Sequence, residues 1–287
     1  MAPRVSVVIP TFNRATLVER AIDSVLGQTH SAFEIIVVDD GSTDNTSATL
    51  RNKYSDKLVV FQQSNRGVSA ARNVGIAHAT GNWIALLDSD DEWLPSKLAQ
   101  QLALIKNHTD CLLCHTDEIW IRNGVRVNAM NKHKKSGGDI YPQCLPLCAI
   151  SPSSVIFQKQ LLDDVGNFDE TLPACEDYDL WLRICAQHKV HYLDQKLLVK
   201  YGGHEDQLSR KHWGMDRFRI KSLQKMLQLN VLSEDKRAST VATLTKKIHI
   251  LLNGAVKHNN TALIEECAEA IRAHSLPIPN AAQHSPG

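Results

Sequence analysis

The sequence predicts an α/β fold with a mixed, mostly parallel sheet that carries helices on both faces, followed by a C-terminal helical extension. Strand-like apolar runs alternate with amphipathic helical patterns over residues 5–108. Polar and acidic side chains follow the ends of several of these runs, where parallel sheets bind their ligands. From about residue 207 onward the pattern is helical. Alternation of this kind implies crossover connections, and therefore a mainly parallel sheet.

Four strand–helix pairs make up the first part of the chain. The predicted strands are residues 5–10, 33–40, 57–63 and 83–88. The predicted helices are residues 15–28, 41–54, 67–81 and 95–108. Pro95 suits the first turn of the last helix, because its fixed φ angle is already helical.

The remainder of the chain is more varied. A strand or hairpin is expected over 111–128, a helix from "CEDYDLWLRICAQ" and a strand at "KLLVKY". The C-terminal helical pattern has breaks at Gly254 and at Asn259–Asn260. We therefore expect an α/β domain over 1–206, a helical extension over 207–275 and a disordered tail over 276–287.

Composition excludes several classes of protein. The 287 residues are 43% hydrophobic and 22% charged, which is ordinary for a globular protein. A net charge of +1 gives no general attraction to nucleic acid or anionic lipid. No apolar run approaches the roughly 20 residues of a membrane span, and "MAPRVSVVIP" lacks the layout of a signal peptide. Seven scattered cysteines favour reduced thiols, so we expect a cytoplasmic protein.

The segment "GNWIALLDSDDEW" ends an apolar strand in a cluster of acids, Asp88, Asp90 and Asp91. Like charges this close repel unless a cation lies among them. One interpretation is a solvated turn that caps the next helix. The other is a D-x-D site for a divalent cation, which would share its remaining positions with water and substrate phosphates. Asn13 and Asp40 also follow strand ends, so one crevice is expected to collect them with Asp88.

Five motifs occur together in one order. They are "VSVVIPTFNR", "IIVVDDGSTD", "NRGVSAARNVG", "LLDSDD" and "FDETLPACEDYDLWLR". In this order and spacing, residues 4–206 resemble the family 2 nucleotide-sugar glycosyltransferases. The resemblance implies a GT-A fold, a Rossmann-like domain around a mixed sheet, and sugar transfer with inversion.

The resemblance also implies roles for individual residues. Asp177 matches the general base that deprotonates the acceptor hydroxyl, although an acid at this position could simply favour the start of a helix. Asp88, Asp90 and His204 match metal ligands for Mn²⁺ or Mg²⁺. The residues that match nucleotide-binding positions are Pro10, Thr11, Asn13, Arg14, Asp40, Arg72 and Asp88. Gly202 and Gly203 stand where relatives often carry a basic residue, which leaves a phosphate contact there in doubt.

The acceptor side is expected near the proposed base. The segment 137–154 contains two prolines and precedes Asp177, so we expect it to shape an acceptor pocket. Ser153, Ser154 and Glu176 are the candidate acceptor contacts.

The predicted function is metal-dependent, inverting transfer of a sugar from a nucleotide-sugar, with a UDP-sugar as the implied donor. The acceptor would be a glycan, a glycolipid or another hydroxyl compound in cell-surface glycan or other glycoconjugate synthesis. Alternatives are a catalytically silent nucleotide-sugar-binding scaffold and a transferase with an RNA acceptor. Basic stretches at 131–135, 209–213 and 246–247 leave open contact with RNA or with the inner face of the membrane. The C-terminal helices leave a homodimer open.

Overall fold

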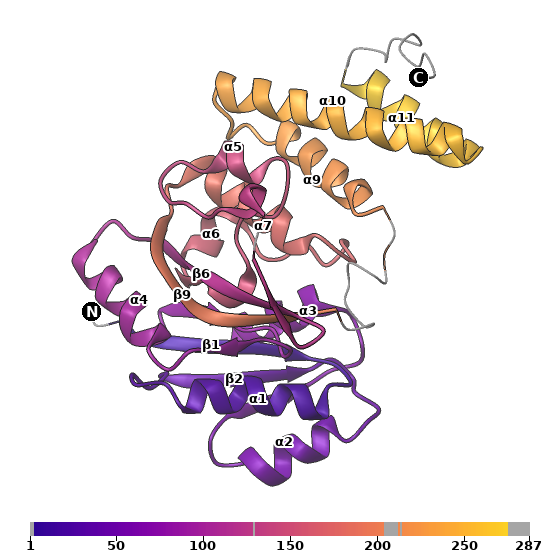
Figure 1. The fold of residues 1–287 in the computed structure, drawn as a ribbon. Coiled ribbons are helices and arrows are strands. Elements are labelled where there is room, and N and C mark those ends of the chain that lie inside the picture. The colour runs from indigo at the N-terminus through magenta and orange to yellow at the C-terminus, as the bar shows by residue number, and fades with distance from the viewer. Residues whose placement is uncertain (1–2, 129, 204–211, 213, 275–287) are drawn as a thin grey trace.

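A computed structural model of the chain describes residues 3–128, 130–203, 212 and 214–274. Its centre is one mixed sheet with the strand order β3-β2-β1-β4-β8-β6-β9-β5, and β7 pairs with β6 (Figure 1). The strands are β1 (Val5–Thr11), β2 (Glu34–Asp39), β3 (Val59–Gln62), β4 (Trp83–Leu86), β5 (Glu92–Trp93), β6 (Leu113–Arg122), β7 (Val125–Val127), β8 (Ile156–Gln158) and β9 (His191–Gly202).

The first four strands pair in parallel, and β6 pairs in parallel with β9. The pairs β4–β8, β6–β8, β6–β7 and β5–β9 are antiparallel. The order β2-β1-β4 brings the carboxyl ends of three parallel strands to one edge of the sheet. This confirms the predicted α/β class and the mostly parallel sheet.

Helices of the α/β part lie on both faces of the sheet, and the C-terminal helices extend beyond it (Figure 1). The helices are α1 (Ala15–Leu26), α2 (Thr46–Tyr54), α3 (Val68–His78), α4 (Lys97–Asn107), α5 (Tyr141–Cys144), α6 (Leu161–Val165), α7 (Glu176–Gln187), α9 (Asp216–Gln228), α10 (Glu234–Lys257) and α11 (Thr261–Ala273). Alternate residues of β1 face opposite sides, so Val7 packs with α1 and α4, whereas Val8 packs with α3 and α7. Both faces are apolar, which explains the continuous Val/Ile runs in the sequence.

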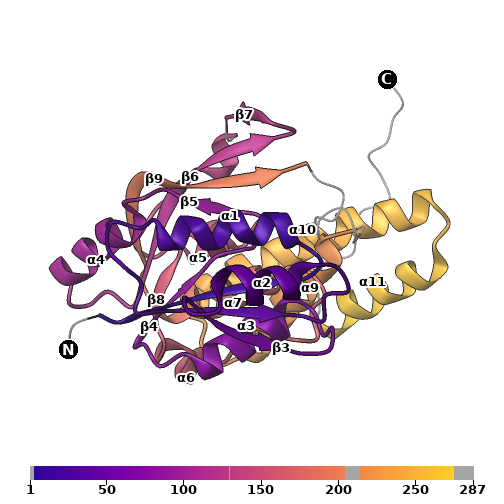
Figure 2. The ribbon, with the colours of Figure 1, turned by 90° about the horizontal axis from the view of Figure 1, so that it is seen from below.

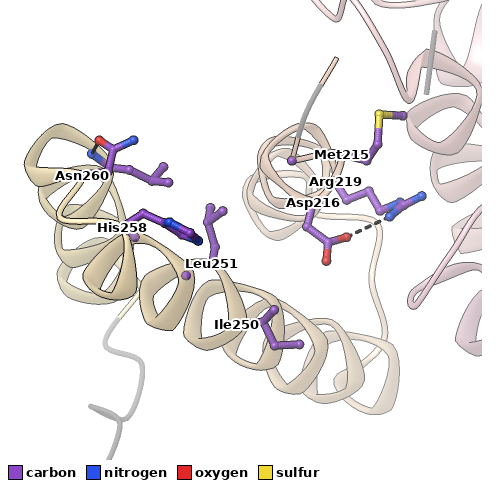
Figure 3. Close-up of a pocket in the computed structure, with 11 residues that line it drawn as sticks. Met215, Asp216, Arg219, Ile250, Leu251, His258 and Asn260 are labelled. Atoms are coloured by element: carbon purple, nitrogen blue, oxygen red, sulfur yellow. Dashed lines mark hydrogen bonds and ion pairs between the residues drawn. The ribbon is translucent and has the colours of Figure 1, made fainter. Parts of the chain in front are cut away.

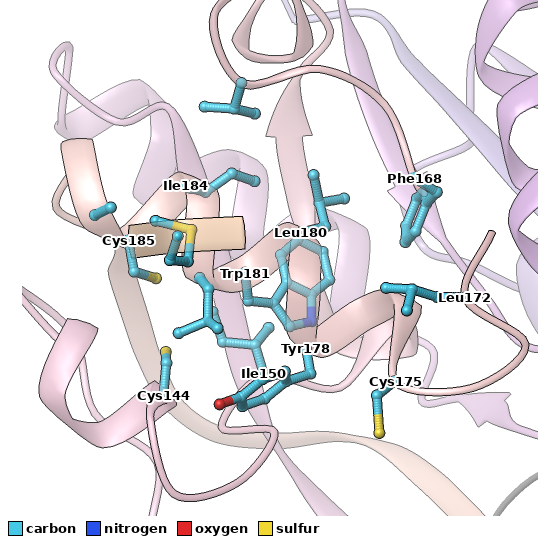
Figure 4. Close-up of a cluster of buried hydrophobic side chains, with 14 of the residues drawn as sticks. Cys144, Ile150, Phe168, Leu172, Cys175, Tyr178, Leu180, Trp181, Ile184 and Cys185 are labelled. Carbon is cyan, nitrogen blue, oxygen red and sulfur yellow. The ribbon is translucent and has the colours of Figure 1, made fainter. Parts of the chain in front are cut away.

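Helix α7 lies at the centre of one of the two buried apolar cores, one on each face of the sheet. Trp181 and Tyr178 are almost fully buried among the side chains that Figure 4 shows around this helix. The same core continues through Phe218 and Leu223 of α9 into Leu244 of α10. The C-terminal helices therefore share a core with the α/β part, and α10 and α11 reach past it to one side (Figure 2).

Two sequence predictions about the C-terminal part have different outcomes. The predicted break at Asn259–Asn260 is confirmed, because Asn260 is the N-cap of α11. The predicted break at Gly254 is wrong, since α10 continues through it to Lys257. One glycine costs a helix only about 1 kcal/mol, and a longer packed helix tolerates that cost. The predicted domain boundary at 206–207 and the predicted tail at 276–287 lie outside the described residues.

Candidate active site

The carboxyl edge of β2, β1 and β4 carries three loops that contact one another. Asn13 joins two of them: its Oδ1 accepts the N–H of Thr43 at 2.7 Å, and its own N–H donates to the Ser42 Oγ at 2.8 Å. Its positive φ of 50° suits asparagine, which tolerates the left-handed region. The structure thus gives Asn13 a loop-fixing role at the position where the sequence predicts a nucleotide contact.

Asp40 ties the loop after β2 to the start of α3. Its Oδ1 accepts hydrogen bonds from the Gln63 side chain (2.7 Å) and the Arg66 backbone (2.9 Å). Its Oδ2 accepts the N–H of Gly67 at 2.8 Å. The carboxylate is almost fully buried and held by these donors, so a contact with a nucleotide base would use its remaining lone pairs. Pro10 and Thr11 lie buried at the end of β1.

The three acids after β4 converge. Carboxylate oxygens of Asp88, Asp90 and Asp91 lie within 4.8 Å of one another. Ser153 organises the group, because its Oγ accepts the N–H of Asp88 (3.1 Å) and donates to Asp91 (2.6 Å). Hard carboxylate oxygens are the donors that Mg²⁺ and Mn²⁺ prefer, so these residues fit a divalent cation.

Asp91 differs from its two neighbours in exposure. It is 2% exposed, and its carboxylate also accepts the N–H of Tyr201 at 3.3 Å. Burial, followed by the nearby charge of Asp90, raises the pKa of Asp91 well above its usual range. Asp88 and Asp90 are therefore the better candidate metal ligands, and Asp91 supports the loop that presents them.

Two arginines offset the negative charge of the acidic cluster formed by Asp88, Asp90 and Asp91. Arg14 pairs with Asp90 at 3.1 Å. Arg72 is 3% exposed and bridges Asp88 (2.7 Å) and Glu176 (2.6 Å). Burial alone lowers the pKa of Arg72, but these two carboxylates raise it above its usual value, so the guanidinium stays charged. Arg72 thus joins the acids after β4 to the start of α7.

Replacing Arg72 by methionine is expected to destabilise the fold by about 3–5 kcal/mol, because Glu176 would remain buried without its partner. The matched control is Arg66→Met, which breaks an exposed pair with Glu170 and should cost less than about 1 kcal/mol. Urea unfolding of both variants measures the difference. Equal losses of stability would contradict the bridging role of Arg72.

Asp177 is half-buried in the first turn of α7. Its Oδ1 accepts the N–H of Tyr178 at 2.7 Å. The Cys148 Sγ lies 3.1 Å from its Oδ2 and also 3.1 Å from the Ile150 carbonyl oxygen, so the thiol proton can be donated to either acceptor. Burial, and then the charge of Asp177, raises the pKa of the Cys148 thiol, so this group stays protonated and can donate. Asp177 is thereby oriented, and it lies next to Glu176 on the Arg72 bridge.

The three predicted acceptor contacts are buried in this structure. Ser153 and Ser154 are 0% exposed; the first holds the acidic cluster, and the second donates to the Ser151 carbonyl at 2.7 Å. Glu176 is 4% exposed and bound to Arg72. All three hydrogen-bond within the protein, and their contact with an acceptor stays a prediction. His204, the predicted third metal ligand, lies outside the described residues.

Sequence reasoning missed a further polar cluster, in which the charged residues Glu118, Lys135 and Lys200 gather around the Ser151 hydroxyl. Lys135 belongs to the basic stretch 131–135, for which the sequence left open contact with RNA or membrane, yet it is only 8% exposed. Lys247, from the basic pair 246–247, is also buried and pairs with Asp216 at 2.8 Å. Internal lysines of this kind look like surface lysines in a sequence, because only the fold supplies their partners.

A separate cavity of about 510 Å³ lies between α9 and the α10–α11 pair (Figure 3). Its lining is mainly apolar and includes Ile250, Leu251 and Leu263, with the Asp216–Arg219 pair at one side. Neither the acidic cluster after β4 nor Asp40, Glu176 or Asp177 lines this cavity, so we do not assign the donor site to it. Within the described part of the chain, no helix is long and apolar enough to cross a membrane.

Comparison with known proteins agrees with this fold and this arrangement. The profile of Glycosyl transferase family 2 matches residues 6–165. An uncharacterized glycosyltransferase of Rickettsia bellii is 32% identical over 217 residues, which are 73% of this chain and 31% of that protein. The chain thus spans about a third of the length of that relative. Escherichia coli WfgD, a UDP-Glc:alpha-D-GlcNAc-diphosphoundecaprenol beta-1,3-glucosyltransferase, is 30% identical over 65% of this chain and 71% of its own.

Two solved structures share the fold. S. aureus TarS 1-349 in complex with UDP-GlcNAc superposes with a TM-score of 0.70 at 22% identity, over 87% of this chain and 73% of that one. The mannosyltransferase PcManGT of Pyrobaculum calidifontis, in complex with GDP-Man and Mn²⁺, superposes with a TM-score of 0.62 at 16% identity. The match covers 94% of this chain and 84% of that one. The profile match covers more than half of the 287 residues. The chain belongs to the family 2 glycosyltransferases and has their GT-A fold.

Proposed function

We propose that this chain transfers a sugar from a nucleotide-sugar to an acceptor hydroxyl, with a divalent cation and with inversion at the anomeric carbon. The proposal rests mainly on the two ion pairs that Arg72 forms, one with Asp88 and one with Glu176. One buried guanidinium holds Asp88 of the acidic cluster and Glu176 beside Asp177, so the donor-side acids and the candidate base belong to one site.

The donor would lie along the carboxyl edge of β2, β1 and β4. Asp88 and Asp90 would hold Mn²⁺ or Mg²⁺, which would offset the charge of the donor diphosphate and of the departing nucleotide. Arg14 now pairs with Asp90, and its guanidinium suits phosphate oxygens. Asp40 would contact the base. UDP is the nucleotide that we favour, because WfgD is named for UDP-Glc and TarS is solved with UDP-GlcNAc.

An inverting sugar transfer needs one carboxylate to act as the general base. Asp177 would accept the proton of the acceptor hydroxyl as its oxygen attacks the anomeric carbon and the bond to the nucleotide diphosphate breaks. A single displacement of this kind inverts the anomeric centre and forms no covalent intermediate. Cys148 would hold the Asp177 carboxylate in place with a weak hydrogen bond that leaves the other lone pairs free.

For the acceptor, we propose a glycan or glycolipid of the cell surface, because WfgD is named for a lipid-linked acceptor. The acceptor would enter past the loop that carries Cys148, next to Asp177. An RNA acceptor is less well supported, since Lys135 and Lys247 from two of the basic stretches are buried in ion pairs. We also propose a cytoplasmic location, peripheral contact with the inner face of the membrane, and a homodimer.

The test is release of free UDP from a panel of UDP-sugars in the presence of Mn²⁺ and candidate acceptors. We expect release with at least one donor, and expect it to stop when EDTA is added. Donor binding without release for any donor–acceptor pair would favour a silent nucleotide-sugar-binding scaffold. Release that is indifferent to EDTA would contradict the metal dependence.

A further inference from the structure

Two histidines and one aspartate converge outside the candidate active site. They are His108, Asp110 and His191, and each has a ligand atom within 4.8 Å of a ligand atom of the other two. The Nε2 of His191 lies 3.8 Å from the Oδ1 of Asp110, and the centroids of the two imidazole rings are 4.8 Å apart. His108 and Asp110 are exposed and His191 is half-buried, so an ion from solvent can reach the group.

The backbone holds His108 and Asp110 in one turn. His108 is the C-cap of α4, where its N–H donates to the Leu104 carbonyl at 3.1 Å. The His108 carbonyl in turn accepts the N–H of Cys111 at 3.0 Å, which closes the turn around Asp110. Cys111 is 1% exposed and anchors the turn in the core. Both side chains are therefore presented from a fixed backbone.

His191 is fixed independently, at the start of β9. It lies beside Cys114 of β6 in the parallel register of these two strands. The preceding residue, Val190, exchanges two backbone hydrogen bonds with Gly138, at 2.7 and 3.0 Å. The group thus joins two segments that are far apart in the sequence and are each held by the sheet or by its connections.

The contacts within the protein do not account for this group. Among the described residues, none of the three side chains has a hydrogen-bond partner, and the Nδ1 of His191 is buried without one. An ion pair between Asp110 and a protonated His191 would contribute little, because Asp110 is 82% exposed and the two atoms are 3.8 Å apart. Such a pair would also leave the position of His108 unexplained. Since buried polar atoms are rarely left unsatisfied, these side chains are available to a ligand from solvent.

The group is separate from the acidic cluster after β4. Strand β9 runs from His191 to Gly202, and near its other end the N–H of Tyr201 donates to Asp91. At roughly 3.3 Å per residue, and with the bend of β9 that Figure 1 shows, the two ends are about 20–30 Å apart. A single ion cannot bind to both groups.

Two imidazoles and one carboxylate suit a different class of cation from the acidic cluster. Imidazole nitrogens favour Zn²⁺, Ni²⁺ and Cu²⁺, whereas sets of oxygen ligands favour Mg²⁺ and Mn²⁺. Ligand atoms around a tetrahedral zinc ion are about 3.3–3.5 Å apart, so the exposed side chains of His108 and Asp110 need to move only slightly. Water would occupy the fourth position.

We propose that His108, Asp110 and His191 bind a transition-metal ion of the Zn²⁺ class, which fastens the end of α4 to the start of β9. The ion would stabilise the folded chain, because the three ligands come together only in the fold. This structural metal site is distinct from the cation site proposed for sugar transfer and does not depend on it.

Calorimetric titration of the metal-free full chain with ZnCl₂ tests the site. It is done without nucleotide and at pH 7.5, because metals bind the neutral imidazole. We expect a single equivalent of Zn²⁺ to bind with a Kd in the micromolar range or tighter, and about a hundredfold excess of Mg²⁺ not to displace it. Saturating Zn²⁺ should raise the Tm by about 5 °C, since it binds the folded state.

Substitution of the ligands gives the decisive comparison. His108→Gln and His191→Gln should each weaken Zn²⁺ binding by at least about tenfold and remove most of the rise in Tm. In EDTA both variants should unfold within about 2 °C of the wild-type chain, because neither side chain loses a hydrogen bond within the described residues. Asp110→Asn, at an 82% exposed position, provides a third variant that should fold normally.

Two further variants are the controls. His30→Gln removes an exposed histidine elsewhere in the chain and should keep the wild-type Kd for Zn²⁺ and the rise in Tm. Asp90→Asn should keep both as well, because the acidic cluster is a separate group. Loss of Zn²⁺ binding in Asp90→Asn would place the ion in the acidic cluster and overturn the inference.

Two other results would also overturn it. One is binding of Zn²⁺ only at millimolar concentrations, which would make the group an ordinary set of surface side chains. The other is equal binding of Zn²⁺ by the wild-type chain and the three ligand variants. All these measurements are made without a nucleotide or an acceptor, so a failure of the proposed function would leave their outcome unchanged.

Discussion

Asp177→Asn is expected to lose sugar transfer by a factor of about 10²–10⁴, the usual contribution of a positioned general base. Asparagine keeps the size of the side chain and can still accept the N–H of Tyr178, so the start of α7 should remain intact. It cannot take the acceptor proton. Donor binding should be preserved within about twofold, because the residue lies on the acceptor side of the Arg72 bridge.

The comparison uses Asp164→Asn, an exposed acid on α6. This control should keep wild-type turnover and wild-type affinity for UDP. Turnover is measured as UDP release, and affinity by titration calorimetry. If Asp177→Asn kept more than a tenth of the wild-type rate, another group would have to be the base.

Asp90→Asn is expected to abolish the metal-dependent part of nucleotide binding. Loss of a direct ligand should weaken UDP binding in Mn²⁺ by at least the roughly 10- to 100-fold that follows loss of a supporting residue. In EDTA the variant and the wild-type chain should bind UDP equally weakly, because neither then has a metal to contribute. Equal affinity for UDP in EDTA would identify Asp90 as a metal ligand. A residue that only holds the loop would change UDP binding without metal as well.

A substitution of Arg14 provides a comparison for the Asp90→Asn variant. Arg14→Met removes the cation that pairs with Asp90 at 3.1 Å but leaves the carboxylate in place. Mn²⁺ alone should therefore bind it at least as well as the wild-type chain, whereas UDP binding should weaken. If both variants lost Mn²⁺ binding to the same extent, Asp90 would act through Arg14 and not as a ligand.

The sequence predicts the architecture well because its main signals are local. Apolar runs and helical periodicity place β1, β2, β3 and β4 and the helices after them within a few residues. Parallel strands with adjacent carboxyl ends then bring Asn13, Asp40 and Asp88 to one edge of the sheet. These steps need no knowledge of side-chain partners.

The details of the site depend on contacts between distant segments, and these the sequence does not reveal. Arg72 resembles an arginine on an amphipathic helix until α7 supplies Glu176 from 104 residues away. Ser153 looks like an acceptor-loop serine, yet its hydroxyl binds Asp91 across 62 residues. Lys135 and Lys200, from segments 65 residues apart, both donate to the Ser151 hydroxyl. In each case a polar side chain that a sequence would place in solvent is buried by the fold.

The most direct test is the binding of UDP to the wild-type chain by titration calorimetry, once with Mn²⁺ and once with EDTA. If Asp88 and Asp90 hold a cation that contacts the diphosphate, binding with Mn²⁺ should be at least about tenfold tighter than with EDTA. Equal affinity under the two conditions would contradict the metal-dependent donor site and, with it, the proposed mechanism.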